Sequence, residues 1–280
     1  MGKITTLFVR KVLEEIDSDI DKHALVRSMG IELNRPVYMI SDTLYYSFFE
    51  RAAAIDRNGT TLPLRAGAAM RSDDYGAFGL AWKSATTLRG SYNRAERYAR
   101  VLTSVSTYEV EATNEGAYMH LHRSGERHLG MRLSNEATIA SILTISQEVS
   151  TAAIHLLAVY FKHPAPKSTT DHETFFGCPV CFDSDRDALL ISNESLQTPN
   201  KLGDASISRF FQSHLETELS KLEEDTALDR QIRRYVAQSL SEGMPMLSDV
   251  AHHFGMSGRT LQRRLAELGY SYQTLVDESR

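Results

Sequence analysis

Residues 247–269 read LSDVAHHFGMSGRTLQRRLAELG and carry the most specific pattern in the chain. Apolar residues recur at three- and four-residue steps in both halves of this stretch, which indicates two short helices. Gly255 supplies the backbone angle of a tight turn between them, and Ser257 offers a hydroxyl that caps the second helix. Gly269 closes that helix. The stretch therefore predicts a helix-turn-helix.

The second of these helices has an apolar back and a basic front. Leu261 and Leu265 lie on the apolar side, and forked hydrogen-bond donors lie at steps of three and four on the other. Such donors suit base edges in the major groove, because Arg pairs with guanine and Gln with adenine. The candidates are Arg259, Gln262 and Arg263 for bases, and Thr260 and Arg264 for phosphates. A helical hairpin with a solvated basic face is the alternative interpretation.

Charge is distributed unevenly along the chain. Its 280 residues hold 31 Lys and Arg against 36 Asp and Glu, so the net charge is −5. Residues 226–280 hold seven arginines and six acids and are near +1, which leaves about −6 for the rest. Residues 256–265 contain three arginines and no acid. A local basic footprint of this kind is enough for recognition of double-stranded DNA.

Residues 1–225 predict an α+β domain, and residues 226–280 predict a small all-α domain after the acidic run at 223–225. In the first domain, helical spacing of apolar residues predicts helices over 7–16, 24–29, 44–55, 86–102 and 134–160, the last capped by Ser134. Alternating patterns predict antiparallel strands over 108–113, 117–122, 128–133, 174–182 and 188–192.

The predicted hairpin at 108–122 places four polar side chains on one face. Glu109, Glu111, His120 and His122 share that face by strand periodicity, opposite Val110, Ala112, Met119 and Leu121. A metal is one interpretation of this set. A solvated polar face is the other, and it is favoured because spacing alone is a weak signal. We therefore expect no metal site.

Cys178 and Cys181 are the two cysteines of the chain. They lack the second pair of ligands that a structural zinc site needs, and they lie in a predicted strand. We interpret them as small buried apolar residues, with a redox switch as the alternative. The absence of a disulfide framework and of a signal peptide favours the cytoplasm.

Enzyme and membrane signatures are missing from the sequence. We find no phosphate-cradling glycine pattern, no Gly-x-Ser-x-Gly elbow and no His-Glu-x-x-His helix, so we expect neither an enzyme nor a cofactor. No apolar run approaches the ~18 residues of a membrane span.

Residues 206–222 predict a helix with one apolar stripe. The stripe contains Ile207, Phe210, Phe211, Leu215, Leu219 and Leu222. One interpretation is a helix docked on its own domain. The other is a homodimer formed through this helix, since the pattern persists over several turns.

The run from Val250 to Leu265 resembles the first helix-turn-helix of the AraC/XylS family of transcription regulators. Residues 230–236 resemble the first helix of that domain. Two upstream blocks, 76–102 and 176–192, are similar to the family branch with an arabinose-binding-like regulatory domain. The resemblance covers roughly residues 20 to 280 and implies that Arg259, Gln262 and Arg263 read bases. It also implies that the N-terminal domain binds a small-molecule effector or mediates dimerisation.

The sequence departs from that family at its end. Family members carry two helix-turn-helix units joined by a linking helix, and residues 271–280 resemble only the start of that helix. Either the chain is a truncated form, or its DNA contact depends on a second copy. The leading hypothesis is an effector-controlled, sequence-specific DNA-binding regulator. The alternative is an effector-sensing or dimerising protein with little DNA binding of its own.

The effector-binding residues are not identified by any motif. One interpretation is a pocket for an anionic or amphipathic molecule, lined by the aromatic residues Trp82, Tyr92 and Tyr98 and the arginines 94, 97 and 100. A buried aromatic cluster beside a solvated arginine face is the favoured interpretation.

Overall fold

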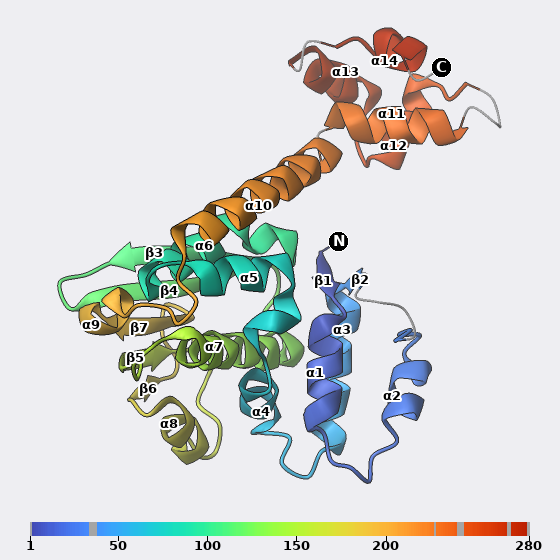
Figure 1. Cartoon of the computed structure of the whole chain (residues 1–280). Helices are drawn as coiled ribbons and strands as arrows, with labels where there is room; N and C mark the ends of the chain where they lie inside the picture. The colour runs from blue at the N-terminus through green and yellow to red at the C-terminus, as the bar shows by residue number, and fades with distance from the viewer. Residues whose placement is uncertain (1, 34–37, 227, 240–243, 268–269, 279–280) are drawn as a thin grey trace. The chain divides into compact units, whose positions relative to one another are not determined.

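The computed structural model describes residues 2–33, 38–226, 228–239, 244–267 and 270–278. The chain divides into two compact units, Met1–Glu216 and Thr217–Arg280 (Figure 1). The division falls within one long helix, α10 (Ala205–Thr226). Among the described residues, no helix is long and apolar enough to cross a membrane.

The first unit mixes helices and strands. Its helices are α1 (Leu7–Glu15), α2 (Lys22–Ser28), α3 (Asp42–Ile55), α4 (Leu62–Ala68), η1 (Ser72–Tyr75), α5 (Ala77–Ser84), α6 (Leu88–Tyr98), η2 (Ala99–Val101), α7 (Leu129–Val149), α8 (Thr170–Phe176) and α9 (Asn193–Gln197). Its strands are β1 (Lys3–Thr5), β2 (Met39–Ser41), β3 (Ser106–Ala112), β4 (Gly116–Arg123), β5 (Leu156–Tyr160), β6 (Val180–Cys181) and β7 (Ala188–Ser192). The predicted α+β class is confirmed.

The main sheet has five strands in the order β3-β4-β7-β5-β6. Its first three pairings are antiparallel, and only β5 and β6 run parallel. The predicted hairpin is confirmed as β3 and β4, with Val110 opposite Met119. Met119 and Leu121 are buried as expected, whereas Ala112, close to the turn, is exposed.

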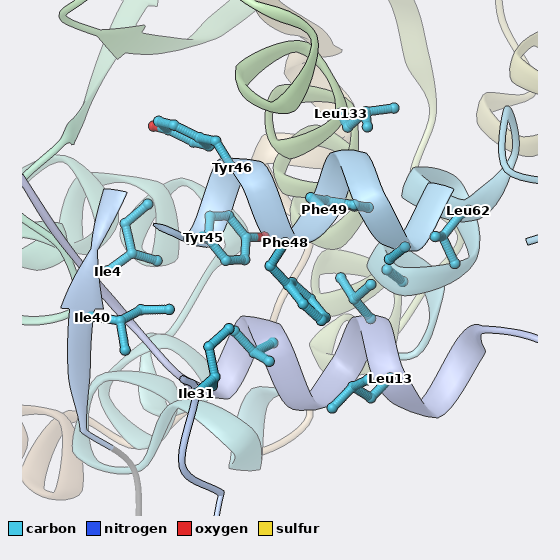
Figure 2. Close-up of a cluster of buried hydrophobic side chains, with 14 of the residues drawn as sticks. Ile4, Leu13, Ile31, Ile40, Tyr45, Tyr46, Phe48, Phe49, Leu62 and Leu133 are labelled. Carbon is cyan, nitrogen blue, oxygen red and sulfur yellow. The ribbon is translucent and has the colours of Figure 1, made fainter. Parts of the chain in front are cut away.

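Helix α7 organises the helical part of this unit. It packs against α3 and α4, and its buried side includes Ile139, Ile142 and Leu143. Figure 2 shows the aromatic core that α3 contributes, in which Phe48 points toward α1 and both Phe48 and Phe49 are fully buried. The three predicted helices over 7–16, 24–29 and 44–55 are confirmed as α1, α2 and α3.

The strand predicted over 128–133 is wrong, because these residues open α7. Six residues that alternate fit a strand and a buried helix equally well, and tertiary contacts decide between them. Gly130 packs so closely that an added Cβ would lie 2.4 Å from the carbonyl oxygen of Tyr46. The Glu50 carboxylate accepts from Gly130 N at 2.6 Å and pairs with His128 Nδ1 at 3.1 Å. Ser134 therefore lies inside the helix and does not cap it.

The predicted extent of this helix to Tyr160 is also wrong. Helix α7 ends at Val149, and residues 156–160 form β5 beside β7. The strand predicted over 174–182 is wrong for most of its length. Residues 174–176 are the end of helix α8, Gly177 caps that helix with φ 67°, and only Val180–Cys181 pair as a strand. In both places an apolar run was too short for its period to distinguish a helix from a strand.

The second unit is all helical. After the end of α10 it contains α11 (Leu228–Ser239), α12 (Leu247–His253), α13 (Gly258–Glu267) and α14 (Tyr272–Glu278). Its core is small and comes from all four of these helices: Ile232, Val236, Val250, Ala251, Leu261, Leu265, Leu275 and Val276.

Candidate functional site

Helices α12 and α13 follow one another across a short turn, in the stretch where the sequence predicts a helix-turn-helix. Gly255 has φ 65° in the turn between them, a backbone angle that favours glycine. Ser257 Oγ accepts a hydrogen bond from Thr260 N at 3.2 Å and so caps α13. Gly255 and Ser257 therefore act where the sequence predicted, whereas Gly269, predicted to close the second helix, lies outside the described residues.

The inner side of α13 is held by the core. Leu261 and Leu265 are fully buried, and Val250 and Ala251 of α12 lie in the same cluster. The small side chain of Ala251, 1% exposed, leaves room for the two helices to approach closely. This packing fixes which face of α13 remains outside.

The outer side of α13 is exposed and basic. Arg259, Gln262, Arg263 and Arg264 are all exposed. Arg263 Nη1 donates to Glu267 Oε1 at 3.2 Å, one turn further along. Both of these side chains are largely in solvent, so the pair is weak and a phosphate or base can replace it.

Thr260 lies differently from the other four candidates. It is half-buried, its N–H bonds to Ser257, and its hydroxyl lies 2.9 Å from Ser257 Oγ. Its polar groups are thus engaged by the helix cap in this structure.

Helix α14 follows the two helices in the sequence and packs into the core of the same unit. Leu275 and Val276 are buried in the shared core, and Ser271 Oγ accepts from Thr274 N at 3.0 Å. The Tyr272 hydroxyl donates to the carbonyl of Pro245 at 2.7 Å. Residues 271–278 therefore support the helix-turn-helix, a role that sequence reasoning missed.

The first unit contains an apolar cavity between its sheet and helices. About 710 Å³ of space, the mouth included, lies between walls from β1, α1, η1, α5, α6, η2, β3, β4 and α7. Ile4, Phe8, Phe78, Trp82, Ile142 and Ile145 give the walls their apolar character. An apolar lining with a few polar groups is typical of small-molecule sites.

Of the effector-binding residues suggested by the sequence, Trp82 lines the cavity, whereas Tyr92, Tyr98, Arg94 and Arg97 are not among its lining residues. The Tyr92 hydroxyl lies 2.9 Å from Ser146 Oγ in the core. Arg94 bonds to the Ser208 hydroxyl. Arg97 Nε and the Tyr98 hydroxyl both donate to Glu216 at 2.6 Å, and the pKa of Tyr98 rises to about 12 through burial and this bond.

The cation of the cavity is instead Arg123, at the end of β4. Sequence reasoning missed this residue. Strand periodicity places Arg123 on the face that carries Met119 and Leu121, so a charge on the apolar face of a predicted strand was the available signal.

The polar face of the hairpin forms two pairs of side chains. Glu109 bonds to His122 at 2.8 Å, and Glu111 bonds to His120 at 2.7 Å. These four residues share one face, as their spacing predicted. Within the described ranges no group of three or more His, Cys, Asp or Glu residues is arranged to hold a metal ion.

The interpretation of the cysteines as buried is wrong. Cys178 is half-buried and Cys181 is exposed, because the segment after Gly177 leaves α8 along the edge of the sheet. Burial raises the pKa of the Cys178 thiol to about 11, which keeps it protonated at neutral pH.

Known proteins similar to this chain are regulators. A family model described as the arabinose-binding domain of AraC transcription regulators, N-terminal part, matches residues 20–200. The ornithine utilization regulator of Pseudomonas aeruginosa is 25% identical over 208 residues, which are 74% of this chain and 60% of that protein. The chain thus spans about three fifths of the length of that relative.

A solved structure shares the fold. The crystal structure of the transcriptional regulator CdpR from Pseudomonas aeruginosa matches with a TM-score of 0.54 at 16% identity, over 97% of this chain and 82% of that one. The family model covers well over half of the sequence. The chain therefore belongs to the AraC transcription regulators that carry an N-terminal arabinose-binding domain.

Proposed function

We propose that the chain is a sequence-specific, DNA-binding transcription regulator whose activity is controlled by a small effector. Residues 226–280 read DNA through α13, and residues 1–225 bind the effector. The observation that carries the proposal is the exposed face of α13, which presents Arg259, Gln262 and Arg263 to solvent. The orientation of this face is set by the buried side of the helix and by the hydrogen bond that caps its N-terminus.

The cavity of the first unit supports the second half of the proposal. Its walls are apolar, and Arg123 and several hydroxyl groups provide a few polar contacts. Small-molecule sites combine these two features, the first for affinity and the second for orientation.

Base reading predicts a difference between cognate and non-specific DNA. A cognate duplex is first selected from a random pool with the wild-type protein. Gln262→Ala or Arg263→Ala is then expected to weaken binding to that duplex by about 1–3 kcal/mol and binding to unrelated DNA by little. Arg264→Ala is expected to weaken both and to reduce the salt dependence of binding.

The control for this comparison is Gln273→Ala, exposed on α14. It is expected to bind both duplexes like the wild type. Equal losses on both duplexes for the Gln262 and Arg263 variants would refute base reading. Failure of the wild-type protein to select any duplex at low salt would favour an effector-sensing protein that does not bind DNA.

The start of α10 supports a homodimer. Leu215 is buried within its own unit, but Ile207 and Phe210 are 51% and 68% exposed, next to Leu202 at 60%. An exposed apolar patch of this kind is typical of an association surface. Two copies related by a two-fold axis present two recognition helices to two half-sites.

Phe210→Asp is expected to raise the dissociation constant of this dimer at least about tenfold, since it places a charge in an apolar interface. Analytical ultracentrifugation measures the change, with Ser220→Asp, exposed further along α10, as the control. A wild-type protein that stays monomeric at high concentration would contradict the proposed dimer.

A further inference from the structure

Among the described residues, no carboxylate pairs with the guanidinium of Arg123. Its Nη1 donates to Ser134 Oγ at 2.6 Å and to the Tyr46 hydroxyl at 3.2 Å, and its Nη2 donates to Thr138 Oγ1 at 2.9 Å. All three acceptors are neutral hydroxyls. In the described part of the chain, its Nε is buried and has no hydrogen-bond partner.

The walls around it supply no negative charge. Arg123 is the one charged residue among the described residues that line the cavity. Glu148 does not line the cavity, but its carboxylate accepts hydrogen bonds from the N and Oγ of the lining residue Ser72 at 2.9 and 2.8 Å. Burial raises the pKa of Tyr75 and Tyr108 above the usual range, so both phenols stay neutral.

A partly buried charge of this kind is costly unless an anion pairs with it. The guanidinium is positioned for such a partner, since its three bonds hold it in place and further N–H groups remain. A planar carboxylate fits a guanidinium well, because two parallel hydrogen bonds join them. A larger, strongly hydrated anion such as a phosphate monoester suits the apolar walls poorly.

We propose that the cavity binds a small organic acid, with the carboxylate on Arg123 and an apolar aryl or alkyl body against Trp82, Phe78 and Ile142. This ligand class deepens the proposed effector control and rests on it. It gives each part of the cavity a role: the hydroxyls of Ser134 and Thr138 hold the arginine, the arginine holds the acid, and the walls take up the apolar body.

The structure provides its own reporter for the test. Trp82 is the only tryptophan in the sequence, is 4% exposed and lines the cavity. Its fluorescence in the full chain is titrated with 3-phenylpropionate, 4-phenylbutyrate and octanoate, and with the amide of each acid. The proposal predicts saturable changes, with at least one acid bound about tenfold or more tightly than its own amide.

Variants of Arg123 test whether this residue causes the preference for the acid over its amide. Arg123→Gln is expected to remove the preference for acid over amide, and Arg123→Lys to retain part of it, because lysine keeps the charge but loses the paired geometry. Arg51→Gln on α3, exposed and outside the cavity, is the matched control and is expected to titrate like the wild type. Thermal melting checks that each variant is folded.

The proposal is overturned if no acid is bound more tightly than its amide by the wild type, or if Arg123→Gln keeps the preference. The wild-type comparison decides the matter even if the Gln variant does not fold. Binding to the selected duplex is measured separately, with and without the acids. Acids that bind through Arg123 without changing DNA affinity would leave the ligand class standing and contradict effector control.

Discussion

Replacing Leu265 with alanine is expected to unfold the second unit and to abolish sequence-specific DNA binding. Leu265 is fully buried beneath α13, in a core to which the described part of the unit contributes eight buried hydrophobic residues. Removal of a buried leucine side chain costs about 2–5 kcal/mol. A unit this small has little stability in reserve, so a loss of this size removes most of it.

The two units allow this effect to be localised. Trp82 reports only on the first unit, where its fluorescence and its response to ligands are expected to stay unchanged. Hydrogen exchange of the backbone amides of α12 and α13 measures the loss of structure in the second unit. Leu265→Met, which nearly conserves volume, is the control and is expected to keep DNA binding. A Leu265→Ala protein with wild-type protection and DNA affinity would refute this account of the core.

Glu136→Ala is expected to destabilise the first unit by about 3–5 kcal/mol, because it leaves two buried imidazoles without their shared partner. Glu136 lies on α7 and is 4% exposed. Its Oε2 lies 2.9 Å from His172 Nε2, and its Oε1 lies 3.1 Å from His163 Nε2. Urea unfolding, followed by Trp82 fluorescence, measures the loss.

The conservative variant Glu136→Gln keeps an acceptor for one histidine and is expected to lose less. Glu173→Gln, on the exposed side of α8, is the control for removing a carboxylate alone. An unfolding free energy of Glu136→Ala within about 1 kcal/mol of the wild type would contradict a structural role for this cluster.

The same cluster predicts a pH dependence. Burial by itself raises the pKa of Glu136, but hydrogen bonds and charge from His163 and His172 outweigh it and leave the pKa lowered. A carboxyl group whose pKa is lower in the folded state stabilises the fold above its unfolded pKa of about 4.3. This contribution is lost as the pH falls through the folded pKa.

The difference in unfolding free energy between the wild type and Glu136→Gln is therefore expected to shrink below about pH 4. Urea unfolding between pH 7 and pH 3 tests this. A difference that stays constant over the whole range would show that the Glu136 carboxylate does not contribute through its charge.

The helix-turn-helix could be predicted from the sequence because its determinants are local. The period of Leu247, Val250, Leu261 and Leu265 defines the buried side, and Gly255 and Ser257 define the turn and the cap. The two partners of each interaction lie within one short stretch, so the local pattern of residues is enough to predict the interaction. The basic face of α13 follows once its buried side is known.

The elements that depended on distant partners were not predictable in this way. Residues 129–133 are helical because Glu50 binds the helix start and Tyr46 leaves room only for a glycine at position 130. An alternating hexapeptide does not contain that information, since both partners lie about eighty positions earlier in the chain.

Local patterns in the sequence were thus enough to predict the α+β class, the hairpin, helices α12 and α13, and the exposed face of α13 that carries Arg259, Gln262 and Arg263. Contacts between distant segments set where α7 begins and ends and which arginines pair with acids. They also place Arg123 in an apolar cavity whose described lining contains no acid. The physical reason is that periodicity encodes which side of an element is buried, whereas a cavity and its charge balance exist only where several distant elements meet.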